Sequence, residues 1–335
     1  MKNLLCWSRM LTYIIRRILY AIPILIGVNL IVFFLFFIVN SPDQMARKIL
    51  GEKNITQADV DNWKKQNGYH LPLLFNAEAS GGAHITETIF FQKSAKLFLF
   101  DFGKSDTNNI DITSQISQRM WASLAIALPT FLVGLLVNIT VSMIVAYYRA
   151  TYVDFWSTIV AVMVMSISQL FYIIGGQWLF GKMLRLSPIS GYDSGVDMLK
   201  FVILPVVIGI ISGIGGGIRF YRTIFLEEVN RDYVRTARAK GVSEAGVLFK
   251  HALKNAMIPI LTNVVLAIPL LFMGSLVMEA FFAIPGLGSF TIEAIQAQDF
   301  AIVRSMVYLA SVLYIVGLLL TDISYTLVDP RIRFG

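Results

Sequence analysis

Long apolar stretches alternate along this chain with shorter polar segments. A helix needs about 20 mostly apolar residues to cross the roughly 30 Å hydrocarbon core of a bilayer, because each residue adds about 1.5 Å. The pattern therefore predicts an all-α polytopic membrane protein with six transmembrane helices. The predicted spans are 18–39, 120–147, 156–180, 201–218, 256–281 and 301–326.

The first apolar stretch follows Arg16 and Arg17, as the core of a secretory signal would. It is longer than such a core, and residues 40–43 lack the small-x-small pattern of a cleavage site. We therefore expect an uncleaved span. Met10 opens a similar run, so the start of translation is open between Met1 and Met10.

Basic residues orient the helices, since short cytoplasmic loops are enriched in Lys and Arg. The segment 219–255 holds eight such residues, whereas 283–300 holds none. We expect the first of these segments in the cytoplasm together with both termini. The resulting divisions are a cytoplasmic N-terminus at 1–17, a first helix at 18–39, an extracytoplasmic subdomain at 40–119, a five-helix domain at 120–327 and a cytoplasmic tail at 328–335.

Part of the extracytoplasmic subdomain shows helix boundary signals. Thr56 stands where an N-cap should be, and Asn67 with Gly68 closes the helix that it starts. The pair Gly81 and Gly82 predicts a loop.

Composition agrees with a bilayer as the solvent. The 335 residues are 56% hydrophobic and 15% charged, with a mean hydropathy of +0.68. The formal charge of +7 gathers at span ends and in two loops, which topology explains without a nucleic acid partner. A single cysteine, Cys6, and three scattered histidines form no metal-binding pattern, so we expect no metal or cofactor on this chain.

The cytoplasmic segment 219–255 predicts two helices joined by a tight turn. In the first, at 222–240, acidic residues come early and basic residues late, and Gly241 stands at the C′ position. Ser243 is the expected N-cap of the second. One interpretation is a loop that folds on its own membrane surface. The small residues Ala237, Ala239 and Gly241 favour another, in which a partner approaches the backbone closely.

Glycine and polar side chains mark other parts of the membrane domain. Gly213, Gly215, Gly216 and Gly217 permit close helix packing or bending in the fourth span. Seven polar residues fall within or near the predicted spans and are candidates for the cargo path. They are Asn29, Asn138, Ser142, Gln177, Asn263, Glu279 and Asp322.

Several motifs resemble the permeases of bacterial ATP-binding-cassette (ABC) importers of the oligopeptide, dipeptide and nickel class. The longest is DYVRTARAKG at 232–241, followed by HALKNA at 251–256. Further similar stretches are YIIRR at 13–17, FDFGKS at 100–105, MEAFFAIPGLG at 278–288 and DPRIR at 329–333. Residues 78–89 have no counterpart in this resemblance, and their role is open.

The resemblance implies an ABC importer permease fold in the bacterial inner membrane. Its expected partners are a second homologous permease, two cytosolic ATPases that bind ATP and Mg²⁺, an external solute-binding protein and membrane lipid. It implies an ATPase-coupling loop and an outer gate. The expected coupling residues are Tyr233, Arg235, Thr236, Ala237, Arg238, Ala239, Lys240, Gly241, Ser243, His251 and Asn255, and the expected gate residues are Glu279, Phe282, Pro285, Gly286 and Gly288.

Other functions lack their sequence signals. No GxxxxGK[ST] phosphate loop is present, and no catalytic set of serine, histidine, aspartate or metal ligands lies in the spans, so we expect a transport subunit and not an enzyme. An autonomous channel or secondary transporter is a remote alternative. Within the importer class, peptides are the expected cargo, with nickel, glutathione or another small solute as alternatives.

Overall fold

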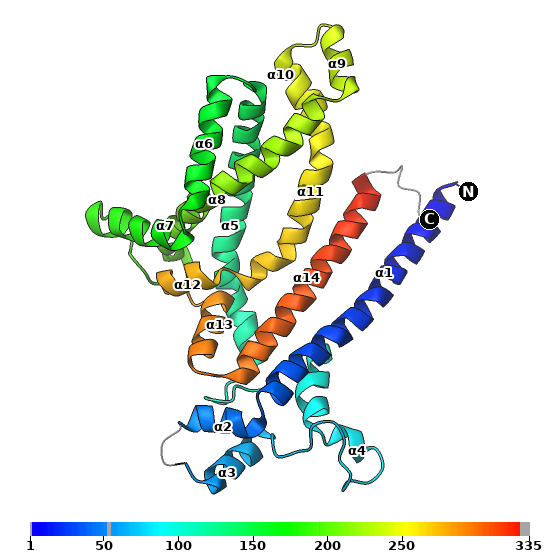
Figure 1. Ribbon diagram of the computed structural model, residues 1–335, viewed down its shortest axis with the longest axis vertical. Helices are drawn as coiled ribbons and strands as arrows, with labels where there is room; N and C mark the ends of the chain where they lie inside the picture. The colour runs from blue at the N-terminus through cyan, green and yellow to red at the C-terminus, as the bar shows by residue number, and fades with distance from the viewer. Residues whose placement is uncertain (1, 52–54, 194, 329–335) are drawn as a thin grey trace. The chain divides into compact units, whose positions relative to one another are not determined.

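The chain folds almost entirely into helices. The computed structural model describes residues 2–51, 55–193 and 195–328, and within these ranges the only β-structure is one isolated bridge between Lys104 and Asp111 (Figure 1). The predicted all-α class is confirmed. The α-helices are α1 Lys2–Phe33, α2 Pro42–Leu50, α3 Gln57–Asn67, α4 Ala83–Thr86, α5 Ile112–Tyr147, α6 Tyr152–Ser166, α7 Gln169–Gly176, α8 Met198–Val229, α9 Asp232–Ala239, α10 Glu244–Gly246, α11 Leu253–Leu270, α12 Leu276–Phe282, α13 Leu287–Gln296 and α14 Phe300–Val328.

Some helices continue into π-helical or 3-10 turns. The π-helical segments are Phe34–Val39, Phe90–Ser94, Gln177–Met183 and Val247–Ala252, and the 3-10 turns are Ala95–Leu99, Gly195–Asp197 and Leu271–Met273. Five helical segments in the described ranges are long and apolar enough to cross a membrane, and two bent pairs raise the number to as many as seven. The count of six and the cytoplasmic termini therefore stay predictions.

The third predicted span, 156–180, is wrong as one straight helix. It is broken between α6 and α7, whose axes differ by 85°. Ile167 and Ser168 are extended at the break. At the break the Val164 carbonyl oxygen accepts the Ile167 N–H at 3.4 Å and the Tyr172 hydroxyl at 2.9 Å, so a side chain of α7 contributes to the end of α6. Apolar composition alone gives no sign of this bend.

The fifth predicted span, 256–281, is also wrong in its extent. Helix α11 ends at Leu270, and Gly274 adopts a φ of +66° that a continuous helix does not allow. Ser275 then caps the separate short helix α12 by accepting the Met278 N–H. Glu279 consequently lies within α12, which is a separate helix from α11.

The chain divides into two compact units. Among the residues that the structure describes, the first comprises 2–51, 55–121 and 287–319. In it α2 and α3 both begin with capping boxes, at Ser41 and Thr56, and Gly68 ends α3 with a left-handed φ. The predicted Thr56 cap and Gly68 stop are confirmed. The end of the first span packs with α2 and α3 around Phe37, Met45 and other buried side chains.

Two buried carboxylates in the first unit join the 105–107 segment to the start of α14. The Asp106 carboxylate accepts from the Ala301 N–H at 3.0 Å and from the Tyr69 hydroxyl at 2.8 Å. Asp299 is fully buried and accepts from Ser105 and Thr107. Burial raises the pKa of the Asp106 carboxyl above its usual value. These contacts tie chain segments almost 200 residues apart.

The second unit contains, within the described residues, 122–193, 195–286 and 320–328. Its core has one cluster around Ile173, Phe282 and Ile284 and another around Phe225, Ala252 and Ile260. Within this unit α9 and α10 lie at one end of the long helices α8 and α11, and α12 lies at the other (Figure 1). The two candidate sites, at 219–255 and at 274–286, are therefore at opposite ends of the unit.

Candidate coupling loop and outer turn

The first predicted cytoplasmic helix, 222–240, is wrong as one element. Helix α8 continues out of the fourth predicted span to Val229, and α9 starts afresh at Asp232. Arg231 between them is extended, with φ −70° and ψ 152°. The long α8 therefore carries the membrane-embedded helix directly into the loop, and α9 is a separate two-turn helix.

The turn after α9 has the geometry that the sequence predicts. Gly241 has a φ of +77° and donates its N–H to the Arg238 carbonyl oxygen, while the Val242 N–H reaches the Ala237 carbonyl oxygen. This pair of bonds is a Schellman motif, which needs a left-handed residue at C′. Ser243 then accepts the Gly246 N–H as the N-cap of α10. Both boundary predictions are confirmed.

Side-chain contacts hold the two short helices together. The Arg238 guanidinium donates to both carboxylate oxygens of Glu244, at 2.6 and 3.0 Å, across the Gly241 turn. Beneath this bidentate pair, Val234, Ala237 and Val247 form a small buried cluster. Apolar packing thus holds α9 and α10 together on the buried side of the loop, and a charged pair holds them together at its surface.

Tyr233 fixes α9 to the flanking long helices. Its hydroxyl donates to the Glu228 carboxylate near the end of α8 and also hydrogen bonds with Asn255 of α11. Burial, together with the Glu228 hydrogen bond, raises the pKa of Tyr233 to about 12. The phenol is therefore neutral at physiological pH and keeps its donor proton. Displacement of α9 would disturb α8 and α11 through this residue.

The outer face of α9 remains open. Arg235, Thr236, Ala239 and Lys240 are exposed, as are Arg238 and Gly241 beside the turn, whereas Ala237 is buried. His251 is partly buried in the π-helical segment, and Asn255 donates its side-chain N–H to the His251 carbonyl oxygen. Ala237 therefore serves packing within the loop, and of the three small residues beside the turn only Ala239 and Gly241 are exposed.

Two contacts that sequence reasoning missed anchor the loop to the rest of the second unit. Arg222 of α8 forms an ion pair with Asp154 of α6 at 2.6 Å, with both side chains largely buried. Arg149 donates to the Asn230 side-chain oxygen at the break between α8 and α9, also at 2.6 Å. These partners are about 70 and 80 residues apart, so no local pattern reveals them.

The four glycines of α8 that the sequence marked for packing or bending have different surroundings. A Cβ atom at Gly215 would meet the Ala161 carbonyl oxygen of α6 at 2.5 Å, and one at Gly217 would collide with the Asn138 side chain of α5. At Gly213 and Gly216 nothing described lies within 4 Å. Gly215 and Gly217 thus allow close helix approach. A hinge role for this segment stays a prediction.

The outer turn is organised around Glu279. This side chain is almost fully buried, and one carboxylate oxygen accepts the Ser275 N–H at 3.2 Å. A Cβ atom at either Gly274 or Gly286 would collide with the Glu279 carboxylate and approach the Ser123 hydroxyl. The carboxylate therefore occupies space that only glycine leaves open at these two positions. We call Glu279, Gly274 and Gly286 the carboxylate clasp.

Further contacts hold the outer turn in place. Phe282 is buried in the core of the second unit, and Ala283 adopts a left-handed φ before the turn at Pro285. The Gln177 amide donates to the carbonyl oxygens of Phe281 and Ile189, at 2.9 and 3.0 Å. Gln177 thus supports the turn and has its donors engaged. Gly288, the remaining predicted gate residue, is buried in α13 of the first unit.

Comparison with known proteins identifies the architecture. Residues 138–334 match the model of the family described as binding-protein-dependent transport system inner membrane component. The chain belongs to this permease family. The match contains α8, the coupling-loop candidate and the outer turn. Together with the apolar helices of the chain, this family match shows that the permease is a multi-pass membrane protein.

Curated relatives cover nearly the whole permease. It is 31% identical over 329 residues to a putative peptide transport system permease protein of Brucella abortus, covering 97% of this chain and 100% of that protein. It is 28% identical to the oligopeptide transport system permease protein AppB of Bacillus subtilis, with 97% and 100% coverage. It is 27% identical to the dipeptide transport system permease protein DppB of Alkalihalophilus pseudofirmus, with the same coverage.

Proposed function

We propose that this permease forms half of the translocation pathway of an ABC importer that carries peptides across the bacterial inner membrane. A second homologous permease supplies the other half, and a solute-binding protein delivers cargo on the outer side. Two cytosolic ATPases bind ATP and Mg²⁺ and hydrolyse the nucleotide. Support comes from the family match and from full-length relatives whose names specify peptide, oligopeptide or dipeptide transport.

The observation that carries the coupling role is the combination of a rigid inner face and an open outer face in the 219–255 loop. The Arg238–Glu244 pair and the Tyr233 hydrogen bonds brace α9 against α10, α8 and α11. An ATPase that binds the exposed side of α9 and changes conformation would therefore move both α8 and α11. The basic residues of the segment support the cytoplasmic location that we propose for it.

The outer turn at 274–286 serves as the gate in this proposal. It lies at the opposite end of the second unit from the coupling loop, with α8 and α11 extending between the two ends (Figure 1). A tilt of these helices driven at α9 would thus reach the turn through contiguous structure.

Substitution of Ala239 by tryptophan tests the docking surface. Ala239 is exposed on α9 and lies outside the buried cluster of Val234, Ala237 and Val247. We expect the bulky ring to prevent close approach of the ATPase, with a loss of roughly tenfold or more in the ATPase recovered with an affinity-tagged permease. The recovery is measured by co-purification from cells that express the whole importer.

The matched control is Thr151→Trp, an exposed position between α5 and α6 that lies on the same proposed cytoplasmic side. It should leave the recovery of ATPase unchanged. Equal recovery of ATPase with Ala239→Trp and with the unaltered permease, at equal permease yield, would show that the exposed face of α9 does not bind the ATPase.

A further inference from the structure

Residues 90–106, in the first unit, run beside two helices that are long and apolar enough to cross a membrane. The first leg of this segment follows α1. The Phe90 and Phe33 rings lie 5.1 Å apart, edge to face. Four residues further along the segment and four residues earlier in α1, the Ser94 carbonyl oxygen accepts the Asn29 amide N–H at 3.0 Å. The first leg therefore runs back along α1, toward the middle of that helix (cyan in Figure 1).

The second leg follows α14 toward its start. Leu97 is fully buried in a cluster with Met306 and Tyr308, and the Phe98 ring packs edge-on against the Tyr308 ring at 6.0 Å. Further along the segment, the Asp106 carboxylate accepts the N–H of Ala301, the second residue of α14, at 3.0 Å. The 90–106 segment thus enters along α1 and returns along α14.

The ends of these two helices open at one membrane surface. The Phe36 and Phe300 rings lie 6.3 Å apart. Phe36 is close to the end of the candidate span Ile14–Val39, and Phe300 is the first residue of the candidate span Phe300–Ser324. In the orientation that we propose, the surface at which both open is the outer one.

The same two helices set the depth that the segment reaches. The candidate spans have 26 and 25 residues, which is about 7–9 Å more helix than a core of about 30 Å requires. Asn29 lies ten residues before the end of the first span and Tyr308 eight residues after the start of the second, about 12–15 Å along each helix. Even if all the surplus helix protrudes at this surface, both contacts lie about 5 Å inside the hydrocarbon.

The backbone of the segment has the internal hydrogen bonds that hydrocarbon requires. Residues 90–94 form a π-helical turn and residues 95–99 a 3-10 turn. The N–H groups of Phe100 and Asp101 then donate to the carbonyl oxygens of Leu97 and Lys96, at 3.0 and 3.3 Å. A segment with these bonds can lie at membrane depth against α1 and α14.

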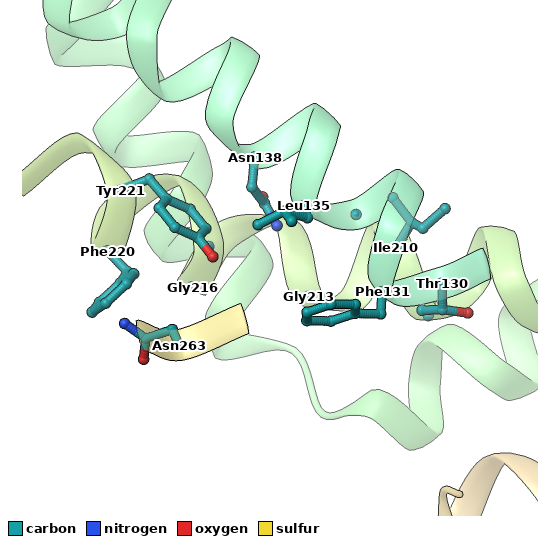
Figure 2. Close-up of a pocket in the computed structure, with 13 residues that line it drawn as sticks. Thr130, Phe131, Leu135, Asn138, Ile210, Gly213, Gly216, Phe220, Tyr221 and Asn263 are labelled. Atoms are coloured by element: carbon teal, nitrogen blue, oxygen red, sulfur yellow. The ribbon is translucent and has the colours of Figure 1, made fainter. Parts of the chain in front are cut away.

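The contact with Ser94 also gives Asn29 a role within the protein. Another span asparagine, Asn138, lines a cavity of about 410 Å³ between α5 and α8 in the second unit (Figure 2). Asn29 is instead only 1% exposed and donates its amide N–H to the segment. A polar side chain within a span is costly unless it bonds to another polar group. The Ser94 carbonyl oxygen is that group for Asn29.

The tip of the segment exposes large apolar side chains. Leu99 is 81% exposed, and Phe98 and Phe100 beside it are exposed as well. Such a cluster favours hydrocarbon over water. Lys96 is exposed on the same turn, and its long aliphatic stem allows the ammonium group to reach lipid headgroups. Asp101 is exposed where the segment turns back toward the membrane surface.

We propose that the 90–106 segment is re-entrant: it dips into the outer leaflet of the bilayer, and Leu99 and Phe100 contact the acyl chains of lipids there. Lipid is the occupant that the depth along α1 and α14 selects for this apolar tip. Part of the segment 40–119, expected to be extracytoplasmic throughout, therefore lies in the membrane. This assignment does not depend on which cargo the permease carries.

The test measures the depth of a nitroxide spin label by electron paramagnetic resonance. Cys6 is the single cysteine of this chain, so a Cys6→Ser background allows labelling at Leu99→Cys alone. The labelled permease is studied in the complete importer, with the cysteines of the other subunits replaced, in vesicles of phosphatidylethanolamine and phosphatidylglycerol. Oxygen concentrates in hydrocarbon whereas a polar nickel chelate stays in water, so the ratio of their collision rates with the label reports its depth.

Two reference positions calibrate the measurement. Leu30→Cys is an exposed apolar position of α1 beside Asn29, and Lys65→Cys is an exposed charged position of α3. We expect the oxygen-to-nickel ratio at Leu99→Cys to match that at Leu30→Cys and to exceed that at Lys65→Cys by roughly threefold or more, because the bilayer core excludes water. Phe91→Cys, an exposed position of the first leg, should also exceed Lys65→Cys and replaces Leu99→Cys if that label lowers the yield.

Either of two other results would overturn the assignment. A ratio at Leu99→Cys equal to that at Lys65→Cys would place the tip in water. A label that collides with neither reagent would show that a protein partner, and not lipid, covers the tip. The measurement requires no uptake of cargo, so failure of the proposed peptide transport would leave its result unchanged.

Discussion

Replacement of Asp299 by alanine is expected to unfold the junction between the 105–107 segment and the start of α14. The carboxylate is completely buried and accepts hydrogen bonds from the Thr107 hydroxyl at 2.9 Å and from the Ile302 N–H at 3.1 Å. It also accepts from the N–H groups of Asp106 and Thr107 and from the Ser105 hydroxyl. Alanine removes every one of these acceptor atoms at once, and the donors on Ser105, Asp106 and Ile302 belong to buried residues.

The expected cost is roughly 3–5 kcal/mol of stability, the range for removing one member of a buried charged network. It is measured as the shift of the thermal unfolding midpoint of the purified permease. Hydrogen–deuterium exchange should increase at the amides of 301–303 and 105–107. The exchange data locate the loss at this junction.

Asp111→Ala is the matched control. Asp111 caps α5 in the same unit by accepting the Ser114 N–H at 2.8 Å, but it is exposed. Its loss should cost only about 1 kcal/mol, as for an ordinary N-cap. If the two variants unfold at the same temperature, the buried Asp299 network does not stabilise the first unit in the way that its contacts indicate.

The second large effect is expected from Gly215→Val, which should prevent α6 and α8 from packing together. Even the first added carbon would lie 2.5 Å from the Ala161 carbonyl oxygen, 2.9 Å from the Met165 Cγ and 3.2 Å from the Met165 backbone nitrogen. Two of these neighbours are backbone atoms of α6, so a rotamer change cannot relieve the clash. The helices must separate.

We expect Gly215→Val to reduce stability on the order of 3 kcal/mol and to lower the yield of monodisperse permease severely. Fluorescence-detected size-exclusion chromatography at increasing temperature measures both. Gly213→Val is the control, because it makes the same change two residues earlier where nothing described lies within 4 Å. Equal thermal stability of the two variants would exclude close packing as the reason for glycine at position 215.

Sequence predicted those parts of the fold that depend on local chemistry. The caps at Thr56 and Ser243 and the left-handed Gly241 follow from side chains within a few residues of the helix ends, and all are present. Apolar length identified the helical stretches as well. It failed at the bends after Ser166 and Leu270 because both sides of each break are equally apolar.

The candidate sites were predictable only in part for the same reason. The exposed and turn residues of the coupling loop could be placed from its boundary signals. The ion pair of Arg222 with Asp154 and the bonds of Gln177 to Phe281 and Ile189 depend on tertiary folding. Likewise, the sequence indicated Glu279 as a candidate cargo contact near a span end. The position of its carboxylate between Gly274 and Gly286 depends on tertiary packing.

The carboxylate clasp also restricts the order in which substitutions can accumulate in the outer turn. A side chain at position 274 or 286 requires the volume that Glu279 now occupies, so a shorter residue at 279 must come first. A shortened residue at 279 would in turn leave the Ser275 N–H without its carboxylate. We therefore expect substitutions at this turn to accumulate in one order only, and we expect both glycines wherever the glutamate is kept.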